Sequence, residues 1–176
     1  MQLPPQRPFR REVLTWEDVD KLVQILVGQL RNAGSFDAML IVTRGGIIPG
    51  GLLAEALDMR QVLTAAVHFP AGVESKPLAA WPDFVQFPDD LLLVGRHTLI
   101  VDDVWGSGRT ITAVRGRVEA AGGKPATCVM HFNPYRSLFT NARPDFYGAV
   151  TDAWIIYPWE IDRGVDRLPS APVGFQ

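Results

Sequence analysis

The pattern of apolar and polar positions predicts a helix near the start of the chain. Thr15 and Asp18 have the spacing of a capping box, in which each side chain bonds the other residue's backbone at a helix N-terminus. Apolar residues then recur at the period of a helix with one buried face: Val19, Leu22, Leu26 and Leu30. The polar and glycine residues at 32–35 are expected to end this helix.

Short continuous apolar runs follow, and such runs are typical of parallel strands that are covered on both faces. The predicted strands are residues 38–42, 61–69, 97–104, 127–132, 145–150 and 154–157. Two helices are expected between them. The first covers 49–58, where Pro49 is tolerated in the opening turn, and the second covers 110–121, where Gly122 suits a left-handed C-cap.

This alternation predicts an α/β fold with an open, mostly parallel sheet and helices on both faces. Residues 1–176 are expected to form one domain, with 1–13 as a loose N-terminal arm. The proline-rich segment 70–96 lacks a sustained period, so it is either a long mobile loop, which we prefer, or a small hairpin with ragged ends. In such sheets ligands bind beyond the carboxyl ends of the strands, where both sharp glycine turns of this chain fall.

Composition and net charge argue against some classes of function, notably nucleic-acid and membrane binding. With 47% hydrophobic and 20% charged residues, the chain is ordinary for a globular protein. A net charge of −2 gives no reason to expect nucleic acid or an anionic membrane as a partner, so any bound anion must meet local geometry. The only cysteine, Cys128, lies in an apolar stretch, so we expect a buried thiol and a cytoplasmic location.

The segment 99–110, LIVDDVWGSGRT, carries the clearest chemistry. A buried strand delivers Asp102 and Asp103 to its carboxyl end, and a turn with two glycines leads into the next helix. Glycines let successive N–H groups point inward, and the helix N-terminus and the Thr110 hydroxyl add to a phosphate cradle. The carboxylates suit sugar hydroxyls or a magnesium ion. The alternative is an acidic structural turn. The patterns of a Walker loop and of a dinucleotide fold are absent.

This segment resembles the signature that binds 5-phosphoribosyl 1-pyrophosphate (PRPP) in type I phosphoribosyltransferases. The resemblance implies that family's fold, with a small hood over the sheet. It implies that Asp102 and Asp103 embrace the ribose hydroxyls and that Asp103 is a ligand of Mg²⁺, the expected cofactor. It further places PRPP against Val104, Trp105, Gly106, Ser107, Gly108, Arg109 and Thr110.

A second segment, 43–50 (TRGGIIPG), resembles the pyrophosphate loop of the purine members, especially xanthine-guanine and archaeal hypoxanthine-guanine enzymes. Arg44 offers a forked cation for pyrophosphate, and Gly45 allows an unusual backbone geometry before the next helix. The alternative is a turn with a surface arginine. The resemblance makes Arg44, with Asp102 and Asp103, a catalytic residue and adds Gly45 to the PRPP-binding set.

The segment 154–160 (WIIYPWE) supplies candidate base-binding residues. Trp154 offers a stacking surface and the Ile155 backbone a polar edge, as the resemblance also implies. Taken alone, Trp154 and Trp159 are better explained as core aromatics, and only the resemblance favours a base-stacking role for Trp154. The chain departs from the purine enzymes in two positions: Gly106 stands at their third acid, and Asn133 stands at the lysine that binds the purine 6-oxygen.

The leading hypothesis is a phosphoribosyltransferase that transfers phosphoribose from PRPP to a nucleobase, expected to be a 6-oxopurine (hypoxanthine, guanine or xanthine), and releases pyrophosphate. The alternatives are a non-catalytic or weakly catalytic PRPP- or nucleotide-binding protein, and an enzyme with another acceptor. The expected partners are PRPP and a nucleobase, and the resemblance implies a homo-oligomer, a dimer or tetramer.

Three further expectations concern single side chains. The histidines, His68, His97 and His131, lack metal-ligand spacing and are expected to be structural. Arg109 is expected either to pair with the 5-phosphate or to point to water. Trp105 is expected either to cover the ribose site or to pack against a partner subunit.

Overall fold

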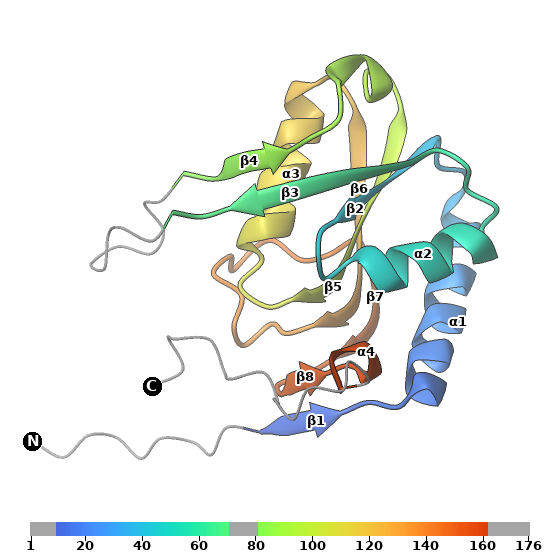
Figure 1. The fold of residues 1–176 in the computed structure, drawn as a ribbon, viewed down its shortest axis with the longest axis vertical. Helices are drawn as coiled ribbons and strands as arrows, with labels where there is room; N and C mark the ends of the chain where they lie inside the picture. Colours follow the sequence, from blue (N-terminus) through green and yellow to red (C-terminus); the bar gives the residue numbers. More distant parts are fainter. Residues whose placement is uncertain (1–9, 71–80, 162–176) are drawn as a thin grey trace, which may run out of the picture.

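The computed structural model describes residues 10–70 and 81–161, and Figure 1 shows how their elements are arranged. In this part of the chain a six-stranded sheet has the order β4-β3-β2-β5-β6-β7. All neighbours are parallel except β3 and β4. The strands are β2 (Ala38–Val42), β3 (Val62–His68), β4 (Asp83–Gln86), β5 (His97–Trp105), β6 (Lys124–Phe132) and β7 (Phe146–Val150).

Helices cover both faces of this sheet, as predicted (Figure 1). α1 (Trp16–Ala33) and α2 (Ile47–Ala56) pack on one face around Leu26 and Leu53, and α3 (Arg109–Ala120) packs on the other around Val114. The predicted capping box is present at α1, since Thr15 and Asp18 bond each other's backbone N–H. Gly122 follows α3 with a φ of 79°, the left-handed conformation expected for it.

Two element boundaries lie earlier than predicted. α2 begins at Ile47, two residues before Pro49, and β6 begins at Lys124 where residue 127 was expected. Lys124 joins the sheet because its partner His97, at the start of β5, extends the parallel ladder. Such a register contact is invisible in the local apolar pattern, which begins only later in the strand.

The chain from Arg11 onward is not a loose arm, so that part of the prediction is wrong. β1 (Arg11–Val13) pairs in parallel with β8 (Trp154–Ile156), and the short helix α4 (Pro158–Ile161) follows. These elements form the small hood beside the main sheet in Figure 1. The N–H of Trp154 donates to the Arg10 carbonyl at 2.9 Å, so the strand forms only against a distant segment. Residues 1–9 lie outside the described part.

Residues 81–96 of the segment 70–96 contain regular structure. β4 lies antiparallel to β3 at the sheet edge, and a short 3-10 helix, η2 (Asp90–Leu92), follows with the Asp89 carboxylate accepting from the Leu91 N–H at 2.9 Å. The strand partner of β4 precedes the segment, so these residues form neither one long loop nor a hairpin of their own, while 71–80 lie outside the described residues. None of the described helices is long and apolar enough to cross a lipid bilayer.

The connections diverge between β2 and β5. From β2 the chain passes through α2 to β3 on one side, and from β5 it passes through α3 to β6 on the other. α2 and α3 also cover opposite faces, so a crevice opens at the carboxyl ends of β2 and β5. The fold thus brings the two glycine turns, one after each strand, to the same place.

Candidate functional site

Two adjacent carboxyl groups lie at the end of β5. Asp102 is 9% exposed, and its Oδ1 accepts the N–H of Asp103 at 2.9 Å. The Asp103 Oδ1 in turn accepts the N–H of Val104 at 2.7 Å. Each carboxyl group is therefore oriented by the next peptide unit, so the strand itself presents both groups to the crevice.

Burial raises the pKa of Asp102 well above its usual value, and the neighbouring charge of Asp103 raises it further. Burial also raises the pKa of Asp103, against the lowering effect of the Val104 N–H bond. Both groups are thus costly to ionise in the free protein. A ligand that brings hydroxyl donors or a cation to them would offset this cost, which favours the binding hypothesis over a structural acidic turn.

The turn after β2 packs directly against these acids. A Cβ on Gly45 would lie 2.5 Å from the Asp103 Oδ1 and 2.8 Å from the Asp102 Oδ1. A Cβ on Gly46 would lie 2.4 Å from the Val101 carbonyl oxygen, so only glycine allows this approach. The peptide bond between Thr43 and Arg44 is cis. Arg44 itself is exposed at the mouth of the crevice, where a forked cation is accessible to an anion.

The turn after β5 enters α3 through Gly108, which has a φ of 79° and is the N-cap of the helix. Neither Gly108 nor the α2 N-cap Gly46 supplies a capping side chain. The first N–H groups of a helix have no partner within the helix, so both helices present donors and a positive dipole end towards the crevice. In α1, by contrast, the capping box already supplies a partner at the helix N-terminus, since the Thr15 side chain accepts the N–H of Asp18.

The Trp105 side chain is buried in the core, so it neither covers the expected ribose site nor is exposed to a partner subunit. The indole is 2% exposed, contacts Phe132 edge to face, and donates its Nε1–H to the Ser137 Oγ at 3.2 Å. A Cβ on Gly108 would lie 2.4 Å from that nitrogen, so the indole lies directly beneath the turn. The Trp105 side chain therefore supports this turn from the core and lines neither cavity at this end of the sheet.

Two cavities adjoin at this end of the sheet. One, of about 500 Å³, is lined by Arg44, Gly45, Asp102, Asp103 and Thr110 among others. The second, of about 230 Å³, is lined by residues of the hood and of the loop after β6. Asp103 and Glu160 line both cavities. The acids, the turn after β2 and Thr110 at the start of α3 therefore line the first cavity, with a smaller chamber beside it.

The smaller cavity contains the three predicted base-binding residues, Asn133, Trp154 and Ile155. Asn133 is 1% exposed, and its Oδ1 accepts the Tyr135 N–H at 3.2 Å. Trp159, by contrast, is stacked on Tyr157 with ring centroids 4.4 Å apart and is buried, as a core aromatic would be. Of the two tryptophans, only Trp154 lines the smaller cavity, while Trp159 also borders the larger one.

Arg136 and Tyr157 are site residues that the sequence did not reveal. The Arg136 guanidinium lies over the Trp154 ring, 5.5 Å from its centroid, and lines the same cavity. Its position in HFNPYR, three residues after Asn133, was the available signal. The Tyr157 hydroxyl donates to the Asp103 carbonyl at 3.1 Å and lies 2.8 Å from the His131 Nδ1.

Replacing Tyr157 by phenylalanine is expected to lower the free energy of unfolding by about 1–3 kcal/mol, because two buried polar groups lose their partner. Burial lowers the pKa of His131 to about 4, so its ring is neutral at neutral pH. Because the Tyr157 hydroxyl donates its one proton to the Asp103 carbonyl, the His131 Nδ1 carries the proton of the second hydrogen bond. Urea denaturation at neutral pH measures the change. Tyr135→Phe, at a residue 80% exposed, is the control, and equal stabilities of the two variants would contradict the hydrogen-bond network.

The other single-residue expectations have mixed outcomes. The Cys128 thiol is buried, as expected, and burial raises its pKa. His131 and His97 have structural contacts, the latter with the Ser35 carbonyl at 3.0 Å. The Arg109 guanidinium lies over the Phe69 ring, 4.2 Å from its centroid, so an aromatic contact replaces the solvent-facing alternative.

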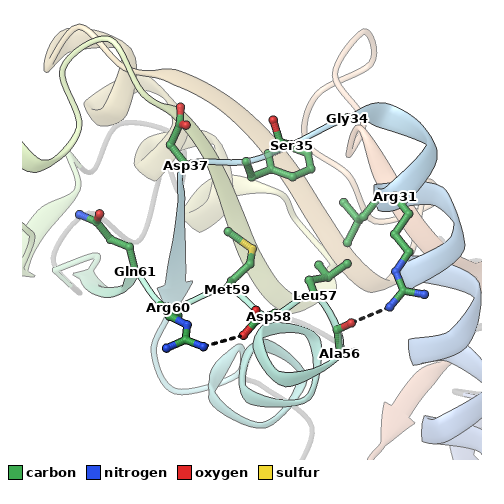
Figure 2. A pocket seen from close by; sticks show the side chains of 12 residues that line it. Arg31, Gly34, Ser35, Asp37, Ala56, Leu57, Asp58, Met59, Arg60 and Gln61 are labelled. Carbon is green, nitrogen blue, oxygen red and sulfur yellow. Dashed lines mark hydrogen bonds and ion pairs between the residues drawn. The ribbon is translucent and has the colours of Figure 1, made fainter.

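A larger hollow, of about 710 Å³, lies at the other end of the sheet, around the ends of α1 and α2 and the start of β2 (Figure 2). There the Arg31 guanidinium donates to the Ala56 carbonyl at 2.8 Å, and Arg60 pairs with Asp58 at 3.6 Å. These are ordinary structural contacts at the amino ends of the strands. Ligands of open parallel sheets bind at the carboxyl ends, so the smaller cavities are the candidate site.

Comparison with known proteins agrees with this placement. Residues 11–158 match the family model of the phosphoribosyl transferase domain. The chain therefore belongs to the phosphoribosyltransferase family, a family of enzymes, as the two sequence motifs indicated. Xanthine-guanine phosphoribosyltransferase of Roseobacter denitrificans is 29% identical over 168 residues, covering 91% of this chain and 89% of the relative. The Cereibacter sphaeroides protein of the same name is 28% identical and covers 91% of both.

Solved structures show the same fold. The purine phosphoribosyltransferase from Pyrococcus horikoshii has a TM-score of 0.73 at 27% identity, covering 92% of this chain and 97% of that one. A Neisseria gonorrhoeae protein with bound ppGpp also has a TM-score of 0.73, at 22% identity, covering 88% and 91%. The predicted mostly parallel α/β fold is thereby confirmed.

Proposed function

We propose that this protein transfers phosphoribose from PRPP to a 6-oxopurine base, hypoxanthine, guanine or xanthine, and releases pyrophosphate. The observation that supports this is the pair of adjoining cavities with Asp103 and Glu160 at their boundary. Two ligands held in separate chambers meet at one boundary, and a transfer reaction requires such a geometry. The named relatives act as purine phosphoribosyltransferases, which favours a purine acceptor.

Each part of PRPP has a matching group in or beside the larger cavity, at the carboxyl ends of β2 and β5. Asp102 and Asp103 accept hydrogen bonds from the ribose hydroxyls, and the turn from Gly106 to Thr110 holds the 5-phosphate at the N-terminus of α3. Arg44 and the N-terminus of α2 bind the pyrophosphate. Cations and oriented amides then stabilise the charge that develops on the departing pyrophosphate.

The residues present fit a magnesium ion that arrives with the substrate. The described residues contain no group of three or more metal-ligating side chains. Magnesium, however, is commonly held by one or two carboxylates together with substrate phosphates. Asp103, a half-buried carboxylate with a raised pKa, is the proposed ligand. The ion would neutralise charge on the acids and on the pyrophosphate oxygens.

In the proposed reaction, the bond from ribose C1 to the pyrophosphate oxygen breaks and a bond from C1 to a ring nitrogen of the base forms. The proton on that nitrogen leaves to solvent, because Gly106 has no titratable group with which to accept it. Trp154 stacks on the base, and the Ile155 backbone binds its edge.

A weakly catalytic nucleotide-binding protein is the second candidate. The observation that favours it is the guanidinium of Arg136 beside Gly106, where a carboxylate would assist proton transfer. Such a protein is stabilised by PRPP and by nucleotides but turns over slowly.

Incubation with PRPP, Mg²⁺ and a panel of hypoxanthine, guanine, xanthine, adenine, uracil and orotate tests the proposal. Nucleotide formation from one or more 6-oxopurines is the expected result. Product from only a non-purine base would favour another acceptor, and ligand-dependent thermal stabilisation without product would favour the binding protein. Absence of both turnover and stabilisation would exclude both candidates. Size-exclusion chromatography with light scattering tests the proposed homo-oligomer, and the proposed cytoplasmic location awaits a localisation experiment.

A further inference from the structure

The boundary between the two cavities is formed by two acidic residues, Asp103 and Glu160, which line both of them. Burial raises the pKa of Asp103, and the nearby charge of Glu160 raises it further. Like charges in such a position destabilise each other. The fold must therefore hold both side chains in place if they are to be ready for a ligand.

Tyr157 bonds both of these acidic residues. Its hydroxyl donates to the Asp103 carbonyl at 3.1 Å, and its backbone N–H donates to the Glu160 Oε2 at 2.8 Å. The N–H of Glu160 donates to the Tyr157 carbonyl at 3.0 Å, which closes the turn. Tyr157 is buried, and its ring is stacked on Trp159 with the two planes 5° apart. One well-packed residue of the hood thus ties the two sides of the boundary together.

The Tyr157 hydroxyl acts on the Asp103 side chain through a single peptide unit. The carbonyl that accepts from the hydroxyl and the N–H of Val104 belong to the same planar group. That N–H donates to the Asp103 Oδ1 at 2.7 Å. β2 pairs with β5 as far as Val101, so Asp103 lies beyond the end of that ladder. A tilt of this peptide plane would therefore turn the carboxyl group with it.

His131 fixes the direction of the Tyr157 hydroxyl. The His131 Nδ1 lies 2.8 Å from the phenol oxygen and carries the proton of that bond. Burial, and then the charges of the nearby acids, raise the pKa of Tyr157 well above its usual value, so the hydroxyl keeps its proton. That proton is the one donated to the Asp103 carbonyl. The network thus links β6, the hood and β5 in one fixed order of donors and acceptors.

We propose that Tyr157 is a positioning residue of the PRPP site, which holds Asp103 and Glu160 at the boundary in the orientation that receives PRPP together with its magnesium ion. This inference rests on the proposed function. Tyr157 acts through Asp103 and Glu160, not by touching the reacting atoms. A carboxyl group that is already oriented costs less to order when the ligand binds. Loss of the hydroxyl is therefore expected to reduce the benefit that Mg²⁺ brings to PRPP binding.

Tyr157→Phe tests this by isothermal titration calorimetry of PRPP, once with Mg²⁺ and once with EDTA. The variant keeps the stacked ring and the backbone bonds to Glu160, and it loses only the hydroxyl. The factor by which Mg²⁺ tightens PRPP binding is expected to fall roughly 3- to 10-fold, the range of one hydrogen bond. The affinity for PRPP in EDTA is expected to stay within about twofold of the wild type.

Leu30→Ala is the control for loss of stability. Leu30 is buried in α1 and lies at the other end of the sheet, so its truncation leaves a cavity far from the site and is at least as destabilising. At a temperature where circular dichroism shows all proteins folded, this variant is expected to keep the full effect of Mg²⁺. An unchanged Mg²⁺ effect in Tyr157→Phe, or an equal loss in Leu30→Ala, would overturn the inference.

His131→Leu gives a second arm, because His131 acts on Asp103 only through the Tyr157 hydroxyl. It is expected to reduce the Mg²⁺ effect less than Tyr157→Phe does, and to add no further loss in the double variant. Full additivity would contradict the network, and so would a wild type whose PRPP affinity does not respond to Mg²⁺. The expected binding pattern without nucleotide formation from any base would instead refute the proposed transferase activity alone.

Discussion

Replacement of both Asp102 and Asp103 by asparagine is expected to reduce nucleotide formation by about 10²–10⁴-fold and, at the same time, to stabilise the free protein. Asparagine keeps the shape and one acceptor oxygen of each side chain but removes the charge that binds Mg²⁺ and strengthens the ribose contacts. Because burial raises the pKa of both acids, their ionised forms are costly in the folded state. The variant is therefore expected to melt at a higher temperature than the wild type at neutral pH.

The gain in stability of the paired-acid variant over the wild type is expected to increase with pH. The folded protein holds protons on these two acids more tightly than the unfolded chain does. Their contribution to stability is therefore fully present below the ordinary aspartate pKa and is lost as pH rises through the raised folded-state value. Thermal denaturation of wild type and variant between pH 4 and pH 8 measures this. The difference in melting temperature is expected to grow with pH, while the contribution of His131 cancels because both proteins retain it.

A matched control is the double variant Asp20→Asn and Asp58→Asn, which removes the same number of charges from exposed positions. Asparagine tolerates the positive φ of 50° at Asp58. The control is expected to retain Mg²⁺-dependent stabilisation by PRPP and to lack the pH-dependent gain. If the paired-acid variant is instead less stable than the wild type at pH 8, the two carboxyl groups are structural.

Replacement of Gly108 by alanine is expected to lower the free energy of unfolding by about 2–5 kcal/mol. Two costs combine. The residue has a φ of 79°, which disfavours a side chain, and the new Cβ would lie 2.4 Å from the Trp105 Nε1 and 2.6 Å from its Cε2. The indole is held by Ser137 and Phe132, so it cannot move without disturbing the core. Because the same turn is the proposed 5-phosphate site, ribose 5-phosphate binding is expected to fall as well.

The control lies in the same helix. Gly116 is exposed within α3, and a Cβ there has nothing within 4 Å, so Gly116→Ala is expected to stabilise the protein by about 0.5–1 kcal/mol. Chemical denaturation of the two variants gives the comparison. Adding Trp105→Phe to Gly108→Ala is expected to recover the steric part of the loss and not the backbone part. Equal stability of Gly108→Ala and the wild type would show that the turn is not supported by the indole.

The elements of the main sheet were predictable because their signals are local. Apolar runs, the Thr15 capping box and the glycine after α3 act through neighbours within a few residues, and the structure places each as expected. The paired acids and the two glycine turns were identified for the same reason. The boundary of β6, the strand β4 and the pairing of β1 depend on hydrogen bonds to distant segments.

The sequence by itself therefore determined the proposed PRPP site of this protein: a strand that carries Asp102 and Asp103 near its end, a glycine turn, and a second turn with Arg44. Only the tertiary structure decided the proposed base site. It directed Trp105 inward beneath Gly108, set Trp154 in the smaller cavity and stacked Trp159 on Tyr157 beside the larger one, and brought Arg136 against Gly106. The physical reason is that a phosphate turn is built from consecutive residues, whereas a base cavity is built from side chains that meet only when β5, β6 and the hood pack together.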